Sequence, residues 1–155
     1  MGKILSRRLK QSKFESIEQE AILNILVASS HLRSSVESAC TKFGISLSQF
    51  NVLRILNGKY PEGYPRCDII SRMIEPAPDV TRLIDRLIKE NLVERYSSVE
   101  DRRLSLARIT KKGQSLLLKI KPEIDALNQI ISNNLSKPES KQLTTLLEKV
   151  YADLF

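Results

Sequence analysis

The sequence has no tryptophan, a single histidine and two cysteines among its 155 residues. Because Cys40 and Cys67 are far apart and form no C-x-x-C pair, neither a disulfide framework nor a zinc site is expected, and a reducing cytosol fits. Cys40 shares a helical stripe with Val36 and Phe43, which favours a buried structural thiol. Cys67 lies near the start of a short helix, where a thiolate could be stabilised. An oxidant-sensing role stays open for either cysteine.

The residue patterns of common catalytic sites are also missing. The sequence contains no glycine-rich phosphate loop, nucleophile elbow or cluster with metal-ligand spacing. His31 lies near the apolar stripe of a long predicted helix, a place typical of a helix surface or an interface, with an effector cavity as the alternative. Glu100 and Asp101 are adjacent at a predicted hairpin tip, a poor site for acid–base chemistry. We therefore expect no enzyme activity, no cofactor and no metal.

No apolar stretch approaches the ~20 residues that a membrane-spanning helix needs. The N-terminal segment 1–14 is strongly basic, and no secretory apolar segment follows it. Residues 1–6 match a myristoylation pattern, which leaves a membrane-surface or protein-interaction module using this segment and amphipathic helices as an alternative function. A flexible basic arm on phosphates, or a solvated tail, is the preferred interpretation, with a cytoplasmic location and no membrane partner.

Positive charge is what the chain has in excess. The net charge of +7 and the isoelectric point near 9.5 favour an anionic partner, either nucleic acid or an anionic membrane surface. A content of 41% hydrophobic and 28% charged residues indicates a folded protein rather than a disordered chain. The length fits one domain, residues 1–155.

Hydrophobic periodicity predicts a mainly α-helical fold. Apolar residues recur every three or four positions through 14–43, and Gly44 then ends this long helix. Shorter helices are expected from Ser46 or Ser48 to Asn57, at 68–74, and from 78 to about 91, with a loop at 58–65.

Alternating and β-branched residues predict a small β-hairpin from strands at 92–96 and 104–109. Thr110 is a good N-cap for a long helix. Pro122 should kink or divide that helix, because proline removes one backbone donor. A last helix follows a break at 133–138.

The segment 79–89 combines an apolar stripe with a charged face. Its exposed positions are Thr81, Arg82, Asp85, Arg86 and Lys89. About twenty residues farther along, the tip 100–103 carries Asp101, Arg102 and Arg103 between the two predicted strands. The helix suits a DNA major groove, and the hairpin suits the adjacent minor groove or the backbone.

Each feature alone has a simpler explanation, because Arg/Asp patterns on helices are usually solvated, salt-bridged surfaces. Their joint occurrence in this order favours a winged helix-turn-helix. Residues 47–110 are then the DNA-binding core. The wide apolar faces of 14–46 and 111–155 predict a helical dimerisation region, buried against a second copy of the chain.

Four sequence words resemble the MarR-type winged helix regulators of bacteria: TRLIDRL at 81–87, LVER at 92–95, DRR at 101–103 and ITKKG at 109–113. The resemblance covers nearly the whole chain, and the order and spacing of these words are more specific than any one of them. The family usually has glycine where Asn91 stands, and asparagine can also adopt the left-handed conformation.

The resemblance implies a homodimer that binds a pseudopalindromic DNA operator, most often as a repressor, and that small aromatic or phenolic effectors or oxidants release. It makes 78–89 the recognition helix, which enters the major groove. It also implies that Asp101 braces the wing through an arginine salt bridge and that Arg103 reaches into a minor groove. Such a protein is cytoplasmic and lies on the nucleoid when bound.

The residue chemistry agrees with these roles. Arginine offers a planar fork for guanine, and a narrow minor groove attracts a guanidinium. Thr81 can reach a phosphate or a thymine methyl group. Asp79 and Asp85 would repel phosphates, so each is expected to orient a neighbouring arginine or to accept from a base. The side chains placed for phosphates are those of Lys89, Arg95, Lys111 and Lys112.

Overall fold

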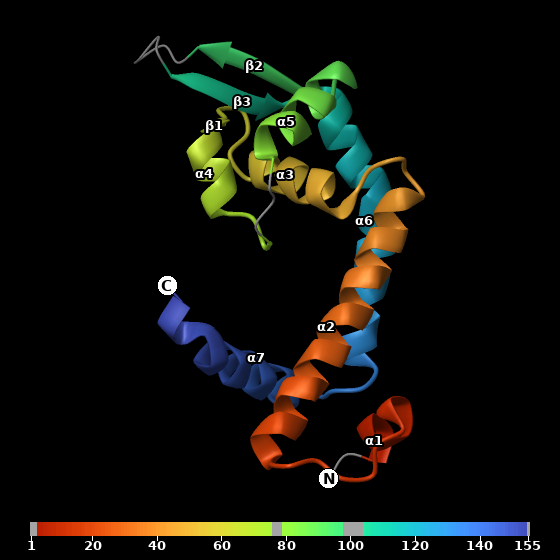
Figure 1. The fold of residues 1–155 in the computed structure, drawn as a ribbon. Helices are drawn as coiled ribbons and strands as arrows, with labels where there is room; N and C mark the ends of the chain where they lie inside the picture. Colours follow the sequence, from red (N-terminus) through yellow and green to blue (C-terminus); the bar gives the residue numbers. More distant parts are fainter. Residues whose placement is uncertain (1–2, 76–78, 98–103, 155) are drawn as a thin grey trace.

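The computed structural model describes residues 3–75, 79–97 and 104–154. It is mainly helical with a small antiparallel sheet, as the sequence predicted (Figure 1). The elements are α1 (Lys3–Leu9), α2 (Ile17–Thr41), α3 (Leu47–Asn57), β1 (Tyr64–Pro65), α4 (Arg66–Ser71), α5 (Val80–Lys89), β2 (Val93–Ser97), β3 (Ser105–Ile109), α6 (Lys111–Ser132), α7 (Lys137–Tyr151) and η1 (Ala152–Leu154).

The sheet has the strand order β1-β3-β2, with both neighbouring pairs antiparallel. Strands β2 and β3 form the predicted hairpin, in which Val93 pairs with Ile109. Strand β1 was not predicted, because the whole of 58–65 was interpreted as loop. Its two residues are too few for an alternating pattern, and Pro65 is tolerated because β1 lies at the edge of the sheet.

The hydrophobic core lies within the winged part of the molecule, which we define as the segment from α3 to β3. It fills the space between α3, α5 and the inner face of the sheet. Its largest fully buried side chains include Leu53 and Leu56 of α3, Leu87 of α5 and Ile109 of β3. Ile120 extends the core into the first half of α6. One cluster therefore joins α5, the sheet and the first half of α6.

Side-chain caps fix where the helices begin. The hydroxyl of Thr110 accepts the N–H of Gly113 at 3.1 Å, which confirms the predicted cap of α6. The same hydroxyl donates to the carbonyl of Asn91 at 2.7 Å, and Asn91 has a φ of 59°, the expected left-handed conformation. A side chain at Gly113 would overlap the carbonyl oxygen of Leu92, so the start of α6 lies directly against the wing.

Helices α2 and α6 run side by side away from the winged part, and α7 projects from the far end of this pair (Figure 1). Helix α6 continues through Pro122, so the predicted division of this helix is wrong. Pro122 is exposed and removes a single backbone hydrogen bond, and α6 packs against α2.

The expectation of a flexible or solvated N-terminal arm is also wrong. Residues Lys3–Leu9 form α1, and the side chain of Leu5 is buried. Helix α2 begins at Ile17 rather than at 14, because the hydroxyl of Ser16 caps it by accepting the N–H of Gln19. After α2, Gly44 turns the chain with a φ of 76°, which fits its predicted role.

Candidate nucleic-acid interface

Helix α5 is amphipathic. It buries Val80, Ile84 and Leu87, while Arg82 and Arg86 are exposed one turn apart. This cationic face arises because the burial period of the helix leaves every basic residue of the segment on the solvent side. Lys89, the last residue of the helix, is exposed as well.

Asp79 serves both the start of α5 and its first arginine. One carboxylate oxygen accepts the backbone N–H of Arg82 at 3.0 Å, and the other lies 2.9 Å from the Nε of the same residue. The Arg82 side chain stays 81% exposed while it makes this ion pair. Asp79 therefore orients Arg82, one of the two roles that the sequence suggested for it.

Asp85 pairs with an arginine from the wing rather than with one on its own helix. Its Oδ1 accepts from the guanidinium of Arg95 on β2 at 2.9 Å, and both side chains are about half exposed. This contact ties the outer face of α5 to the wing. Sequence spacing could not identify the partner, because the two residues meet only once α5 packs on the sheet.

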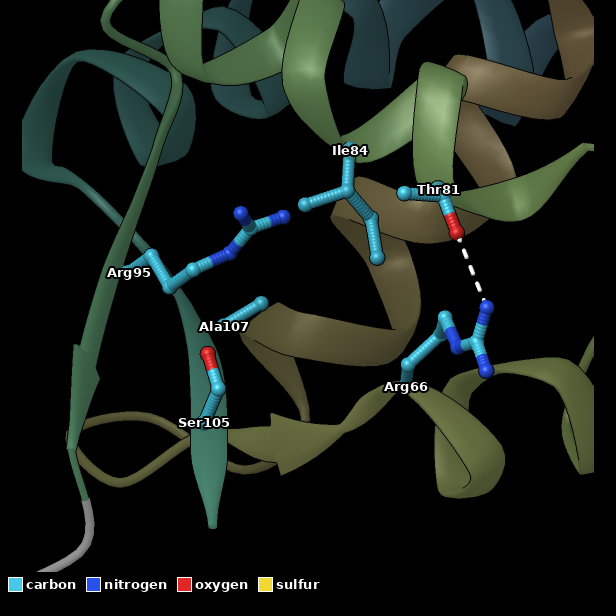
Figure 2. A pocket seen from close by; sticks show the side chains of 6 residues that line it. All are labelled: Arg66, Thr81, Ile84, Arg95, Ser105 and Ala107. Carbon is cyan, nitrogen blue, oxygen red and sulfur yellow. Dashed lines mark hydrogen bonds between the residues drawn. The ribbon is translucent and has the colours of Figure 1, made fainter. Parts of the chain in front are cut away.

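Arg66, the first residue of α4, was missed by the sequence analysis. Its guanidinium donates to the hydroxyl of Thr81 at 3.0 Å. Both residues line a hollow of about 260 Å³ between α4, α5 and the sheet, as Figure 2 shows. A single arginine after a proline carries little signal by itself, and only the fold brings it beside α5.

The two lysines that open α6 have local partners. The Nζ of Lys112 donates to the carbonyl of Glu90 at 2.7 Å, so it closes the C-terminal end of α5, where a cation is favourable. The Nζ of Lys111 lies 5.4 Å from the centre of the Tyr60 ring. Both side chains are exposed and remain within reach of solvent anions.

Comparison with known proteins shows to which family this chain belongs. The model of the MarR family matches residues 45–105. The HTH-type transcriptional regulator MhqR of Bacillus subtilis (strain 168) is 31% identical over 109 residues, which are 70% of this chain and 74% of that protein. The chain belongs to the MarR family. It is a DNA-binding transcriptional regulator with a winged helix-turn-helix, and its family is not one of enzymes.

Solved structures of MarR-family regulators share the fold of the chain. The structure of a MepR–DNA complex from S. aureus superposes with a TM-score of 0.74 at 22% identity, covering 83% of this chain and 94% of that one. The structure of CouR from Rhodococcus jostii RHA1, bound to p-coumaroyl-CoA, superposes with a TM-score of 0.76 at 19% identity, covering 88% and 95%. The likeness therefore extends beyond the winged part to the terminal helices.

The wing of this MarR-family chain is described at its base but not at its tip. Asp101, Arg102 and Arg103 lie outside the described residues, so their predicted roles rest on the sequence. At the base, the Nε of Arg108 donates to Glu94 at 2.8 Å, and its guanidinium lies 4.7 Å from the centre of the Tyr96 ring. These contacts cross between β2 and β3 and hold the two strands of the hairpin together.

The two cysteines differ in environment. Cys40 is fully buried, and burial, with the nearby Glu37 carboxylate, raises the pKa of its thiol to about 11. It is the structural thiol that its helical stripe predicted. Cys67 is exposed, with its Sγ 3.6 Å from the Oδ1 of Asp68.

His31 lies exposed on the surface of α2, one of the two positions that the sequence favoured. Within residues 3–75, 79–97 and 104–154, no group of three acidic, histidine or cysteine side chains is arranged to hold a metal ion. Over the same residues, no helix is long and apolar enough to cross a membrane.

Proposed function

We propose that this protein binds a pseudopalindromic DNA operator as a homodimer and represses transcription in the bacterial cytoplasm. The observation that carries the proposal is the exposed cationic face of α5, with Arg82 and Arg86 one turn apart on a helix whose other face is in the core. A helix with its side chains is about 10–12 Å across. The major groove of B-DNA is about 12 Å wide and admits it.

Direct readout falls to the arginines of this face. Arg82 and Arg86 can each offer two N–H groups to a guanine, and an ion pair with Asp79 holds the first of them. Thr81 contacts a phosphate or a thymine methyl group, and Lys89 contacts the backbone. A fixed arginine loses less conformational entropy on binding than a free one.

The wing supplies the second set of contacts. Arg95, held by Asp85, lies at its base and contacts the backbone. Arg103 and Arg102 are proposed to reach the adjacent minor groove, with Asp101 bracing the tip. Lys111 and Lys112 contribute positive charge beside the backbone, although Lys112 also closes the end of α5.

The proposed dimer is based on apolar side chains that remain exposed to solvent in the single chain. Six of them lie on α2 and α7 and are between 38% and 70% exposed: Ile17, Ile22, Leu26, Leu143, Leu146 and Val150. Exposed apolar surfaces of this extent mark interaction sites. A second copy, related by a two-fold axis, would cover the same side chains on both partners at once.

This arrangement divides the chain by role. Residues 47–110 form the DNA-binding core, and 14–46 with 111–155 form the dimerisation region of a single MarR-like domain. A two-fold dimer places its recognition helices about one helical turn of DNA apart, roughly 34 Å.

Selection of bound duplexes from random DNA by the purified protein tests the proposal. We expect two inverted half-sites with centres about 10 bp apart. Replacement of Arg82 by alanine should relax the preference at one base pair of each half-site and cost about 1–3 kcal/mol per contact. The control is Arg54→Ala, which removes an exposed arginine of α3 and should leave the selected sequence unchanged. A monomer that selects no sequence at physiological salt would refute the proposal, and binding to anionic vesicles would then favour a membrane-surface role.

A response to a small molecule is a second candidate function, favoured by a hollow of about 500 Å³ between α3 and α6. Apolar Phe50, Leu117 and Ile124 line it together with Arg54 and the ion pair of Lys121 with Asp125. Apolar walls with a few polar groups suit an aromatic acid or a phenol, whose anionic or hydroxyl group would meet Arg54. CouR, which shares this fold, was solved with an aromatic thioester bound. Titration of the protein–operator complex with a panel of aromatic acids and phenols tests this, and release that Lys121→Gln weakens would support it.

A further inference from the structure

The hollow beside α5 has a cation on each of two opposite sides. Figure 2 shows Arg66 and Arg95 on opposite sides of it, with Ile84 and Ala107 between them; the Arg95 guanidinium points toward Ile84, and the Arg66 guanidinium is turned toward Thr81. The hydroxyl-bearing residues Thr81 and Ser105 complete its lining. Three separate segments build this site, namely the start of α4, the side of α5 that bears Thr81 and Ile84, and strands β2 and β3.

Each of the two arginines is held by a hydrogen bond and has further N–H donors. One terminal nitrogen of Arg66 donates to Thr81 at 3.0 Å, and one terminal nitrogen of Arg95 donates to Asp85 at 2.9 Å. A guanidinium has five N–H donors, which is more than these described bonds engage. The Thr81 hydroxyl accepts from Arg66, so its own proton is free to point to a further acceptor.

The charge balance of the hollow favours an anion. The carboxylate of Asp85 offsets the charge of Arg95, whereas the partner of Arg66 at this site is a neutral hydroxyl. Ile84 and Ala107 are both buried, and apolar surroundings of this kind strengthen the attraction between a guanidinium and an anion beside them.

The position of the hollow identifies the anion. When a recognition helix enters a major groove and its wing enters the adjacent minor groove, one sugar–phosphate strand runs between them. The hollow lies on the surface between α5 and the wing. We propose that it seats a phosphate of this strand and that Arg66 is a DNA-contacting residue.

This inference rests on the proposed function, because it requires α5 in the major groove. The simpler explanation is that Arg66 only links α4 to α5 through Thr81. The two explanations differ in the counterions released on binding, since each neutralised phosphate contributes about 0.9 to the slope of log K against log salt. A purely structural link contributes nothing to this slope.

The first experiment measures that slope for the intact protein on the duplex it selects and on a mixed-sequence duplex of about three helical turns, roughly 30 bp. We expect Arg66→Gln to flatten the slope by about 0.9 per protomer on both duplexes. The variant Arg66→Lys keeps the charge and should keep the slope. The control Lys119→Gln loses one positive charge from an exposed position of α6, outside both hollows, and should also keep it.

The second experiment replaces single phosphates of the selected duplex by uncharged methylphosphonates. One position in each half-site should weaken binding of the wild-type protein but not weaken binding of Arg66→Gln further, because that variant has already lost the contact. A wild-type slope in Arg66→Gln, or equal sensitivity of both proteins at every position, would overturn the inference.

The two proposals fail in different ways. If the wild-type protein prefers its selected duplex and Arg66→Gln keeps the wild-type slope, the phosphate seat is refuted and the proposed function stands. If the protein selects no sequence at all, the proposed function fails whatever the slope of the variant.

Discussion

The winged core and the terminal helices differ in how far their apolar side chains are buried. In the core, Leu53, Leu56 and Leu87 have no exposed surface, whereas α7 has no buried residue at all within its bounds. On α2 and α7, Leu26 and Leu146 are 59% and 52% exposed. The core is therefore complete in one chain, while the terminal helices present a surface that a single chain leaves uncovered.

This difference separates two sources of stability. Full burial of a leucine contributes about 1.5–3 kcal/mol relative to its exposure. The core obtains this contribution from contacts within the chain, and its stability should not depend on protein concentration. The contribution available to the terminal helices appears only on association, so it should depend on concentration.

The largest expected effect is the loss of a core side chain. Leu53→Ala should lower the free energy of unfolding by about 2–5 kcal/mol, because it removes buried contacts and leaves a cavity. Denaturant unfolding at several protein concentrations measures this, and the loss should be the same at each. The matched control is Leu118→Ala on α6, where the side chain is 70% exposed and the change should stay within about 0.5 kcal/mol. Equal losses in the two variants would contradict the division into a closed core and an open periphery.

The second prediction concerns the open surface. Leu146→Glu places a charge in the proposed dimer interface and should give a monomer in sedimentation velocity, with a circular dichroism spectrum that keeps its helical content. Operator affinity should fall by about 10²–10⁴, because two half-sites are no longer linked. Thr145→Glu introduces the same charge on the opposite side of α7 and should stay dimeric. An unfolded Leu146→Glu protein would show that the core is not complete alone.

The third prediction addresses the junction of the two regions. Thr110→Ala removes the cap of Gly113 and the bond to the Asn91 carbonyl, and should cost about 1 kcal/mol. Thr110→Ser keeps the hydroxyl and should recover most of this loss. Thermal unfolding of the three proteins measures the order. A serine variant as unstable as the alanine variant would assign the effect to the methyl group instead.

Features that depend on local chemistry were predicted from the sequence. The apolar stripe of α5 and the cap at Thr110 follow from residue types a few positions apart. Ser46, which caps α3, was one of the two predicted starts, and the left-handed turn at Asn91 was expected from the family resemblance. The hairpin was predicted for the same reason. Hydrophobic periodicity of this kind is clearest in an amphipathic helix or strand that packs on one face only.

Features that depend on contacts between distant segments were not predicted. Strand β1 is recognisable only by its pairing with β3, and the burial of Leu5 only by the surface that α1 meets. The same holds at the interface, where Arg95 meets Asp85 and Arg66 meets Thr81 across 10 and 15 positions of sequence. The sequence predicts which basic residues contact DNA, but it did not predict the contacts that orient them.

The smallest expected effect crosses the boundary between the two regions. The guanidinium of Arg33 on α2 lies 2.7 Å from the carboxylate of Glu75, close before α5, and both side chains are about half exposed. Exposed ion pairs contribute about 0–1 kcal/mol, so a double-mutant cycle with Arg33→Gln and Glu75→Gln should give a coupling in this range that vanishes at high salt.

The pair of Lys42 and Glu123 is a matched comparison, because it has the same 2.7 Å distance but joins α2 to α6 within the terminal region. Both cycles should give similar couplings in unfolding. Of the two pairs, Arg33–Glu75 is the one that links α2, a helix of the proposed dimerisation region, to the segment before α5, the proposed recognition helix, so its loss alone should also change operator affinity. Operator affinity could instead change on loss of both pairs or of neither pair. Either result would show that the Arg33–Glu75 contact does not specifically position α5 relative to the α5 of the second copy.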